Sequence, residues 1–223
     1  MSNPSIAPRS SAPRCRLEMI MTADLSPLDI RLTEHVLDTA VRLFTRRDAR
    51  DVGMPAIARE ADVDLDVLRR HFPTKLDLVY AVTTRSTRAL VTRQIAADRP
   101  DEPPVRRLSV LIRSHIEFSW EHRTEEELRR GLLRTLRVIY PDRHREMTRH
   151  LRRYREHIGE IIAAGREAGT FAPAHPGGSA GTVLETLDGI LNWYEPAGGL
   201  TITELGDVYV DLIIHHQLRA PRS

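Results

Sequence analysis

Apolar side chains recur every three or four positions in nearly every segment from Ser26 onward, and this period most narrows what the chain can fold into. The first such segment places one apolar stripe at Leu32, Val36, Leu37, Ala40, Val41 and Phe44. This spacing is that of an amphipathic α-helix. No segment alternates apolar and polar residues as a half-buried strand would. The sequence therefore predicts an all-α fold.

Prolines and capping residues divide the first part of the chain into four predicted helices. Ser26 and Pro27 suit the start of a helix that reaches about residue 47. Pro55 opens a short second helix, and residues 62–64 interrupt the pattern before a third short helix that ends at the aromatic Phe72. Thr74 and Asp77 have the spacing of a capping box for a fourth helix reaching about residue 95. Two short helices joined by a three-residue turn are typical of a helix-turn-helix.

Three runs in this region carry a pattern that extends beyond the helix-turn-helix itself. They are Val36-Leu37-Asp38-Thr39-Ala40-Val41-Arg42-Leu43-Phe44, Ile57-Ala58-Arg59-Glu60-Ala61-Asp62-Val63 and Leu68-Arg69-Arg70-His71-Phe72-Pro73-Thr74-Lys75. In order and spacing they resemble the DNA-binding domain of the TetR family of transcriptional regulators. The resemblance covers residues 30–80. It implies an N-terminal three-helix DNA-binding domain followed by a C-terminal helical domain for ligand binding and dimerisation, with residues 65–72 as the recognition helix.

The resemblance also implies which side chains contact a double-stranded DNA operator. Arg69 and Arg70 would reach guanine edges or phosphates, and His71 would donate to a phosphate. Lys75 stands at the start of the next helix, where the family commonly makes a phosphate contact. A solvated basic face is an equal alternative for either arginine taken singly.

The turn departs from the family pattern, which generally has a glycine near position 62 and a small hydroxyl residue near 64. Asp62, Asp64 and Asp66 stand here instead, and residues 28–76 are formally neutral. Asp64 suits an N-cap and Asp66 suits the positive end of the helix dipole, but carboxylates repel phosphates. Two interpretations stay open. Either Asp64 or Asp66 accepts a hydrogen bond from a cytosine amino group, or this chain has lost DNA binding and acts by heterodimerisation.

The remaining chain predicts helices only, after a proline-rich linker at residues 96–104. The expected helices span residues 105–122, 124–138, 141–169, 179–194 and 201–218. Thr124 with Glu127 and Thr201 with Glu204 have capping-box spacings, and Gly169 suits the end of the 141–169 helix. We therefore expect a disordered arm at 1–25, a DNA-binding domain at 26–75 and a ligand-binding and dimerisation domain at 76–218.

Several C-terminal segments are similar to the acyl-CoA-responsive subgroup of the TetR family. They are Arg153-Tyr154-Arg155, Gly165-Arg166-Glu167-Ala168-Gly169-Thr170-Phe171 and the run from Trp193 to Leu205. The resemblance implies a homodimer built from the last two long helices. The expected interface residues are Leu184, Leu187, Leu191, Val208 and Leu212.

The same resemblance implies a small-molecule effector, an acyl-CoA or another hydrophobic metabolite of lipid or sterol breakdown. Its phosphates need arginines, while its acyl chain needs an apolar channel. The expected ligand-binding residues are Phe118, Arg134, Arg137, Tyr140, Tyr154 and Trp193. Each of the aromatic residues is more often part of a core than of a pocket.

Composition and motifs argue against other classes. No glycine-rich phosphate loop or cysteine nucleophile supports an enzyme, and the only cysteine, Cys15, lies in the N-terminal arm. Histidine pairs such as His115 and His122 are seven residues apart, which is wider than usual metal-ligand spacing. We expect no metal, cofactor or membrane association, and a cytoplasmic location.

Overall fold

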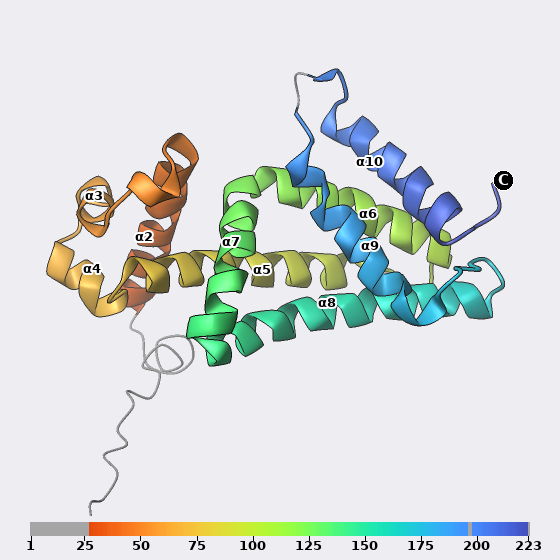
Figure 1. The fold of residues 1–223 in the computed structure, drawn as a ribbon, viewed down its shortest axis with the longest axis horizontal. Helices are drawn as coiled ribbons and strands as arrows, with labels where there is room; N and C mark the ends of the chain where they lie inside the picture. The colour runs from red at the N-terminus through yellow and green to blue at the C-terminus, as the bar shows by residue number, and fades with distance from the viewer. Residues whose placement is uncertain (1–26, 196–197, 223) are drawn as a thin grey trace, which may run out of the picture. The chain divides into compact units, whose positions relative to one another are not determined.

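The computed structural model describes residues 27–195 and 198–222, and every regular element within these ranges is helical (Figure 1). The predicted all-α class is confirmed. The chain divides into two compact units, one ending at Lys75 and the other beginning at Leu76, and each is described by itself. The predicted arm at residues 1–25, the cap at Ser26 and the thiol of Cys15 lie outside the described residues.

The N-terminal unit contains helices α2 (Pro27–Arg46), α3 (Met54–Glu60) and α4 (Leu65–His71), with a 3₁₀ turn, η1 (Ala49–Asp51), between α2 and α3. α3 packs against both α2 and α4. The core of the unit consists of apolar side chains that are at most 9% exposed: Val36, Leu37, Ala40, Leu43, Phe44, Val52, Ile57, Ala58, Ala61, Leu68 and Phe72. The apolar period read from the sequence therefore marks the buried face.

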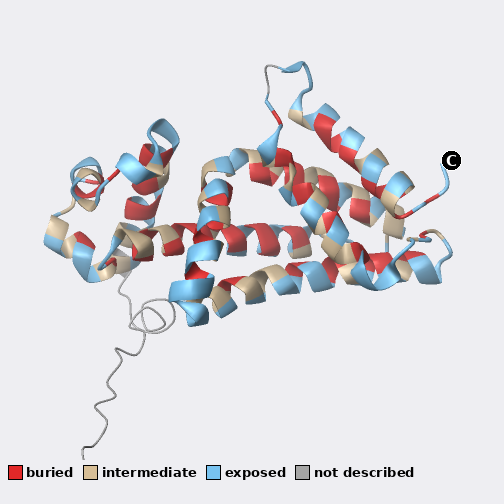
Figure 2. Cartoon of the chain, in the orientation of Figure 1, coloured by how far each residue is buried: buried red, intermediate tan, exposed pale blue. Residues whose placement is uncertain are grey.

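The C-terminal unit contains longer helices and three short irregular turns. The helices are α5 (Lys75–Ala97, which begins at the boundary), α6 (Pro104–Glu121), α7 (Arg123–Ile139), α8 (Pro141–Glu167), α9 (Ser179–Asp188) and α10 (Ile202–Val210). The turns are η2 (Pro176–Gly178), η3 (Ile190–Asn192) and the π-helical η5 (Asp211–Gln217). Figure 2 shows buried positions along α5, α6 and α8.

α6 is central to this unit because it packs against α8, α9 and α10. The positions Leu108, Ile112 and Ile116 repeat every four residues along α6 and are at most 1% exposed. A smaller cluster joins Tyr80 of α5, Leu132 and Leu136 of α7, and Met147 of α8. The unit therefore has one main apolar core and a satellite cluster.

The structure confirms the predicted cap at Thr201 and contradicts the predicted cap at Thr124. Thr201 and Glu204 form the predicted capping box. Thr124 does not cap α7, because α7 already begins at Arg123. His122 is both the C-cap of α6 and the N-cap of α7, so Thr124 lies inside α7 and cannot be its N-cap.

Two predicted C-terminal helices are shorter or less regular than expected. The helix expected at 179–194 ends at Asp188, because Gly189 follows and the chain then continues as a 3₁₀ turn. The helix expected at 201–218 is α-helical only to Val210 and widens into a π-helix beyond it. Gly169 has a φ of 68° after α8, as a C-terminal capping glycine requires.

Candidate functional site

The turn between α3 and α4 is a helix C-cap built on an aspartate in a left-handed conformation. Asp62 has a φ of 53°. The amide of Asp62 donates to the carbonyl of Arg59 (3.3 Å), and the amide of Val63 donates to the carbonyl of Ala58 (2.9 Å). These bonds are those of a Schellman motif, which usually has glycine at the left-handed position. Aspartate is one of the few other residues that tolerate this conformation.

Asp64 then begins α4 as a side-chain cap. Its carboxylate accepts hydrogen bonds from the amides of Asp66 (2.8 Å) and Val67 (3.3 Å). Asp66 stands in the first turn, where a carboxylate suits the helix dipole. The prediction that Asp64 is an N-cap is confirmed.

The opposite end of α4 carries its basic residues. Arg69 and Arg70 are exposed, and His71 is half-buried in the same last turn. Leu68 is buried (1% exposed) and anchors the helix to the core. α4 therefore offers exposed carboxylates at its first turn and exposed guanidinium groups at its last turn.

Lys75 is engaged within its own unit. Its ammonium group donates to the backbone carbonyl of Ala49 and, at 3.3 Å, to that of Arg50. Beside it, hydrogen bonds from Arg50 lower the pKa of Asp48 to about 2. The expected phosphate contact of Lys75 would have to compete with the two carbonyl groups of η1.

A buried polar pair lies inside the C-terminal unit. The Nδ1 atom of His115 on α6 lies 2.9 Å from the hydroxyl oxygen of Tyr154 on α8, and the two rings stack. These residues are 2% and 1% exposed. Burial lowers the pKa of His115 and raises that of Tyr154, because both charged forms lose hydration.

A buried ion pair lies on α7, beside the same core. The Nε atom of Arg129 donates to Glu126 (3.0 Å), and its terminal nitrogen also reaches Asp188 of α9 (3.3 Å). Arg129 and Glu126 are 4% and 3% exposed, and the Oε1 atom of Glu126 has no hydrogen-bond partner among the described residues. Charged groups without full compensation are costly in a core, so such a network is typical of a functional site.

The six predicted ligand-binding residues do not gather at one place. Phe118 and Tyr154 lie in the main core. Arg134 and Arg137 are exposed on α7, and Tyr140 is 42% exposed under the guanidinium group of Arg143. Trp193 is 55% exposed, and its indole nitrogen donates to the hydroxyl of Tyr209 (3.1 Å).

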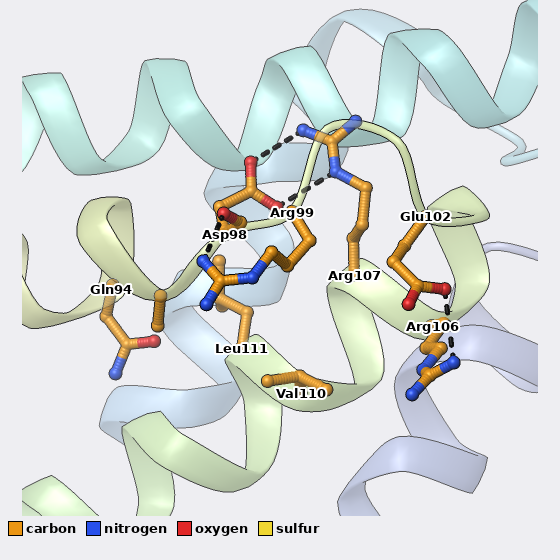
Figure 3. A pocket seen from close by; sticks show the side chains of 9 residues that line it. Gln94, Asp98, Arg99, Glu102, Arg106, Arg107, Val110 and Leu111 are labelled. Atoms are coloured by element: carbon orange, nitrogen blue, oxygen red, sulfur yellow. Dashed lines mark hydrogen bonds and ion pairs between the residues drawn. The ribbon is translucent and has the colours of Figure 1, made fainter.

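None of those six residues lines either of two cavities in the described part of the C-terminal unit. The first, about 110 Å³, lies between the end of α5 and the start of α6 (Figure 3). The second, about 360 Å³, is an open cleft beside Trp120, Tyr194 and Ile202. The ligand residues remain a prediction.

The predicted dimer residues differ in exposure. Val208 and Leu212 are 49% and 38% exposed, so an apolar face of α10 and η5 reaches the surface. Leu184 and Leu191 are half-buried. Leu187 is 1% exposed and belongs to the core of its own subunit, where it has no apolar surface left for a partner.

The sequence alone did not predict the pairing of His115 with Tyr154 or of Arg129 with Glu126 and Asp188, although a signal was present. His115 occupies a position on the apolar stripe of α6, four residues after Leu111. Arg129 likewise shares a face of α7 with the buried Leu132 and Leu136. A polar residue on an apolar stripe points to a partner on a neighbouring helix.

No group of three or more metal-ligating side chains gathers among residues 27–195 and 198–222. In the same ranges, none of the helices combines the length and apolar character needed to cross a membrane.

A helix-turn-helix unit followed by an all-helical unit defines the class of helix-turn-helix transcriptional regulators. Family models match both parts of the chain. Residues 36–82 match the bacterial regulatory proteins of the tetR family, and residues 101–216 match the tetracyclin repressor-like C-terminal domain. The chain belongs to the TetR family of transcriptional regulators, as the resemblance implied.

Solved structures share the fold at low sequence identity. A tetR-family regulatory protein from Rhodococcus RHA1 is 19% identical with a TM-score of 0.77, over 86% of this chain and 99% of that one. AibR in complex with isovaleryl coenzyme A and operator DNA is 20% identical with a TM-score of 0.69, over 85% and 100%. The ketosteroid transcriptional regulator KstR2 of Mycobacterium tuberculosis is 19% identical with a TM-score of 0.65, over 83% and 94%.

The search of curated proteins gave no match to this chain.

Proposed function

We propose that this regulator is a ligand-responsive repressor that binds a palindromic operator as a homodimer. The observation that carries the proposal is the exposed, capped helix α4, with Arg69 and Arg70 at its surface after a helix-turn-helix turn. A recognition helix of this kind enters the major groove, and two copies about 34 Å apart read the two halves of a palindrome. Residues 26–75 would form the DNA-binding domain, and residues 76–218 the ligand-binding and dimerisation domain.

The contacts proposed for DNA come from both ends of α4. Arg69 and Arg70 donate to guanine edges or phosphates, and His71 donates to a phosphate. Asp64 and Asp66 stand at the start of α4, where a carboxylate accepts from a cytosine amino group. Lys75 supplies a phosphate contact only if its ammonium leaves the carbonyls of η1.

The effector proposed for the C-terminal unit is an acyl-CoA or another hydrophobic metabolite of lipid or sterol breakdown. The support is the fold shared with AibR, whose structure contains isovaleryl coenzyme A, and with a ketosteroid regulator. Phe118 and Tyr154 are the predicted ligand residues that lie in the main core, where Tyr154 is hydrogen-bonded to the buried His115. The apolar part of a ligand beside these residues would separate α6 from α8. Arg134 and Arg137 are exposed on α7 and would bind the phosphates of an acyl-CoA.

Regulation follows if the effector prefers one conformation of the dimer over another. A ligand shifts a conformational equilibrium only by its difference in affinity for the two states. Binding inside the C-terminal unit would favour a dimer whose two recognition helices are wrongly spaced for the operator.

DNA binding to the region upstream of the protein's own gene tests this proposal. The purified dimer is titrated at low and at physiological salt, with an unrelated duplex as the competitor. We expect specific binding that weakens steeply with salt, because phosphate contacts release counterions. Arg69→Ala and Arg70→Ala should each weaken binding, whereas Arg166→Ala, an exposed arginine on α8, is the matched control. Equal affinity for the unrelated duplex at both salts would contradict operator recognition.

A second candidate function rests on the three exposed carboxylates at the start of α4. Asp62, Asp64 and Asp66 place negative charge where DNA phosphates approach, which weakens the electrostatic attraction. In this alternative the chain pairs with another regulator and does not bind DNA alone. It predicts no DNA binding at low salt for the wild type, together with a heterodimer on co-expression with other TetR-family chains of the same genome.

A further inference from the structure

The cavity between α5 and α6 is lined by charged side chains around an apolar wall. Asp98, Arg99, Glu102, Arg106 and Arg107 supply the charges. Gln94, Ala97, Val110 and Leu111 complete the lining. Figure 3 shows Asp98 and Arg107 pointing toward one another on one side, with Glu102 and Arg106 meeting on the other.

One of the two ion pairs is a fixed part of the wall. Arg107 donates to both oxygens of Asp98, at 2.9 and 2.7 Å, and the two side chains are 11% and 8% exposed. The bond from Arg107 holds the pKa of Asp98 below its usual range. A bidentate, shielded pair of this kind is strong, so neither partner is free for a ligand.

The other two arginines are held weakly. The only interaction that the described residues give the guanidinium group of Arg99 is a long bond (3.4 Å) to the carbonyl oxygen of Asp98. Arg106 pairs with Glu102 at 3.1 Å, with side chains 69% and 32% exposed, and exposed pairs contribute little. The cavity lining carries three arginines and two carboxylates, which leaves one positive charge.

The first turn of α6 supplies Arg106 and Arg107 to the lining, and the helix begins at Pro104 after the cap residue Pro103. Neither proline has an amide hydrogen, so the positive charge at this end of the cavity comes from the arginine side chains.

We propose that this cavity is a second small-molecule site, which binds the carboxylate group of a short-chain carboxylic acid between Arg99 and Arg106. A guanidinium fork matches a carboxylate in geometry. The apolar wall of Ala97, Val110 and Leu111 receives the hydrocarbon part. This wall consists of only three side chains, so the hydrocarbon part that it covers is short. This site goes beyond the proposed effector and does not depend on DNA binding.

The test is a ligand-observed NMR titration of the full chain with butyrate, its neutral analogue butyramide and inorganic phosphate. We expect butyrate to bind, butyramide to bind at least about tenfold more weakly, and phosphate not to displace butyrate at equal concentration. Arg99→Gln should weaken butyrate binding about two- to fivefold, as expected for a partly exposed charge pair. Arg166→Gln is the control for net charge and should leave it unchanged.

A variant that is expected to bind butyrate more tightly separates a loss of binding from a loss of folding. Glu102→Gln removes the carboxylate that competes for Arg106, so butyrate should bind about two- to fivefold more tightly. A misfolded variant cannot produce this gain. Equal binding of butyrate and butyramide, displacement by phosphate, or no gain in Glu102→Gln would each overturn the proposal. Operator binding measured on the same samples is a separate readout, so failure here leaves the proposed function untouched.

Discussion

Asp64 combines a role in folding with a negative charge on the proposed recognition helix. Its side chain caps α4 through the amides of Asp66 and Val67, yet it places negative charge at the end of the helix that would approach DNA. Asp64→Ala should cost about 1 kcal/mol of stability, because the cap is lost. Asp64→Ser keeps the cap without the charge, so it should retain stability and bind an unrelated duplex more tightly at low salt.

Chemical denaturation and DNA titration of the two variants check these expectations. Weaker operator binding by Asp64→Ser than by the wild type would support a direct base contact, and tighter operator binding would contradict it. If Asp64→Ala were as stable as the wild type, the cap would contribute nothing.

His115 should make stability depend on pH. Its folded pKa lies below the ordinary value of 6.5 because it is buried, so the unfolded chain binds its proton more readily than the folded chain. The stabilising contribution is complete above pH 6.5 and is lost as the pH falls below it. The slope for one proton is at most about 1.4 kcal/mol per pH unit.

Urea denaturation at pH 7.5, 6.5 and 5.5 measures this effect. His115→Asn keeps a polar partner for Tyr154 but cannot titrate, so its stability should fall less than that of the wild type between pH 6.5 and 5.5. Parallel curves for the two proteins would assign the acid sensitivity to other groups.

Replacing glycine by alanine should change stability in opposite directions at Gly165 and at Gly131. A Cβ atom on Gly165 of α8 would overlap the ring of Phe171, whereas a Cβ on Gly131 of α7 meets nothing within 4 Å. Gly165→Ala should destabilise the protein by about 1–3 kcal/mol through overpacking. Gly131→Ala should stabilise it by about 0.5–1 kcal/mol through helix propensity. Thermal denaturation of the two variants measures these changes in stability. A change of the same sign in both variants would contradict the packing of Phe171 on α8.

The helical pattern could be predicted because its causes are local. Apolar period, prolines and caps such as Thr201 act within one or two turns, and they placed most helix starts and ends within a few residues. The predicted helix ends were wrong where a neighbouring element determines how a helix begins or ends. His122 joins α6 directly to α7, which removes the Thr124 cap, and the π-helical η5 has no local sequence signal.

The candidate sites were less predictable because they depend on contacts far apart in the sequence. His115 and Tyr154 are 39 residues apart, and Arg129 and Asp188 are 59 apart. The proposed DNA contacts Arg69, Arg70 and His71 are consecutive on one short helix, so a local motif was enough to predict them. The six predicted ligand-binding residues, inferred from the family resemblance and from residue type, do not share one environment.

At the scale of the whole molecule, the exposed apolar face of α10 and η5 predicts a dimer. Val208→Glu and Leu212→Glu place charge on this face, so each should convert the dimer into a monomer and reduce operator affinity. Val138→Glu changes a more exposed apolar residue (78% exposed) on α7 and should leave the mass unchanged. Light scattering after size-exclusion chromatography gives the mass. A dimeric Leu212→Glu variant or a monomeric wild type would contradict this interface.

Lys75 is the only lysine of the 223 residues, and it is the last residue of the N-terminal unit. A lysine-specific protease therefore has one target in the whole chain, the bond to Leu76 in the first turn of α5. Cleavage within a helix requires local opening, and here the ammonium must also leave the carbonyls of Ala49 and Arg50. The cutting rate thus reports the population of the locally open state of this segment, and the same single cut divides the covalent chain into residues 1–75 and 76–223.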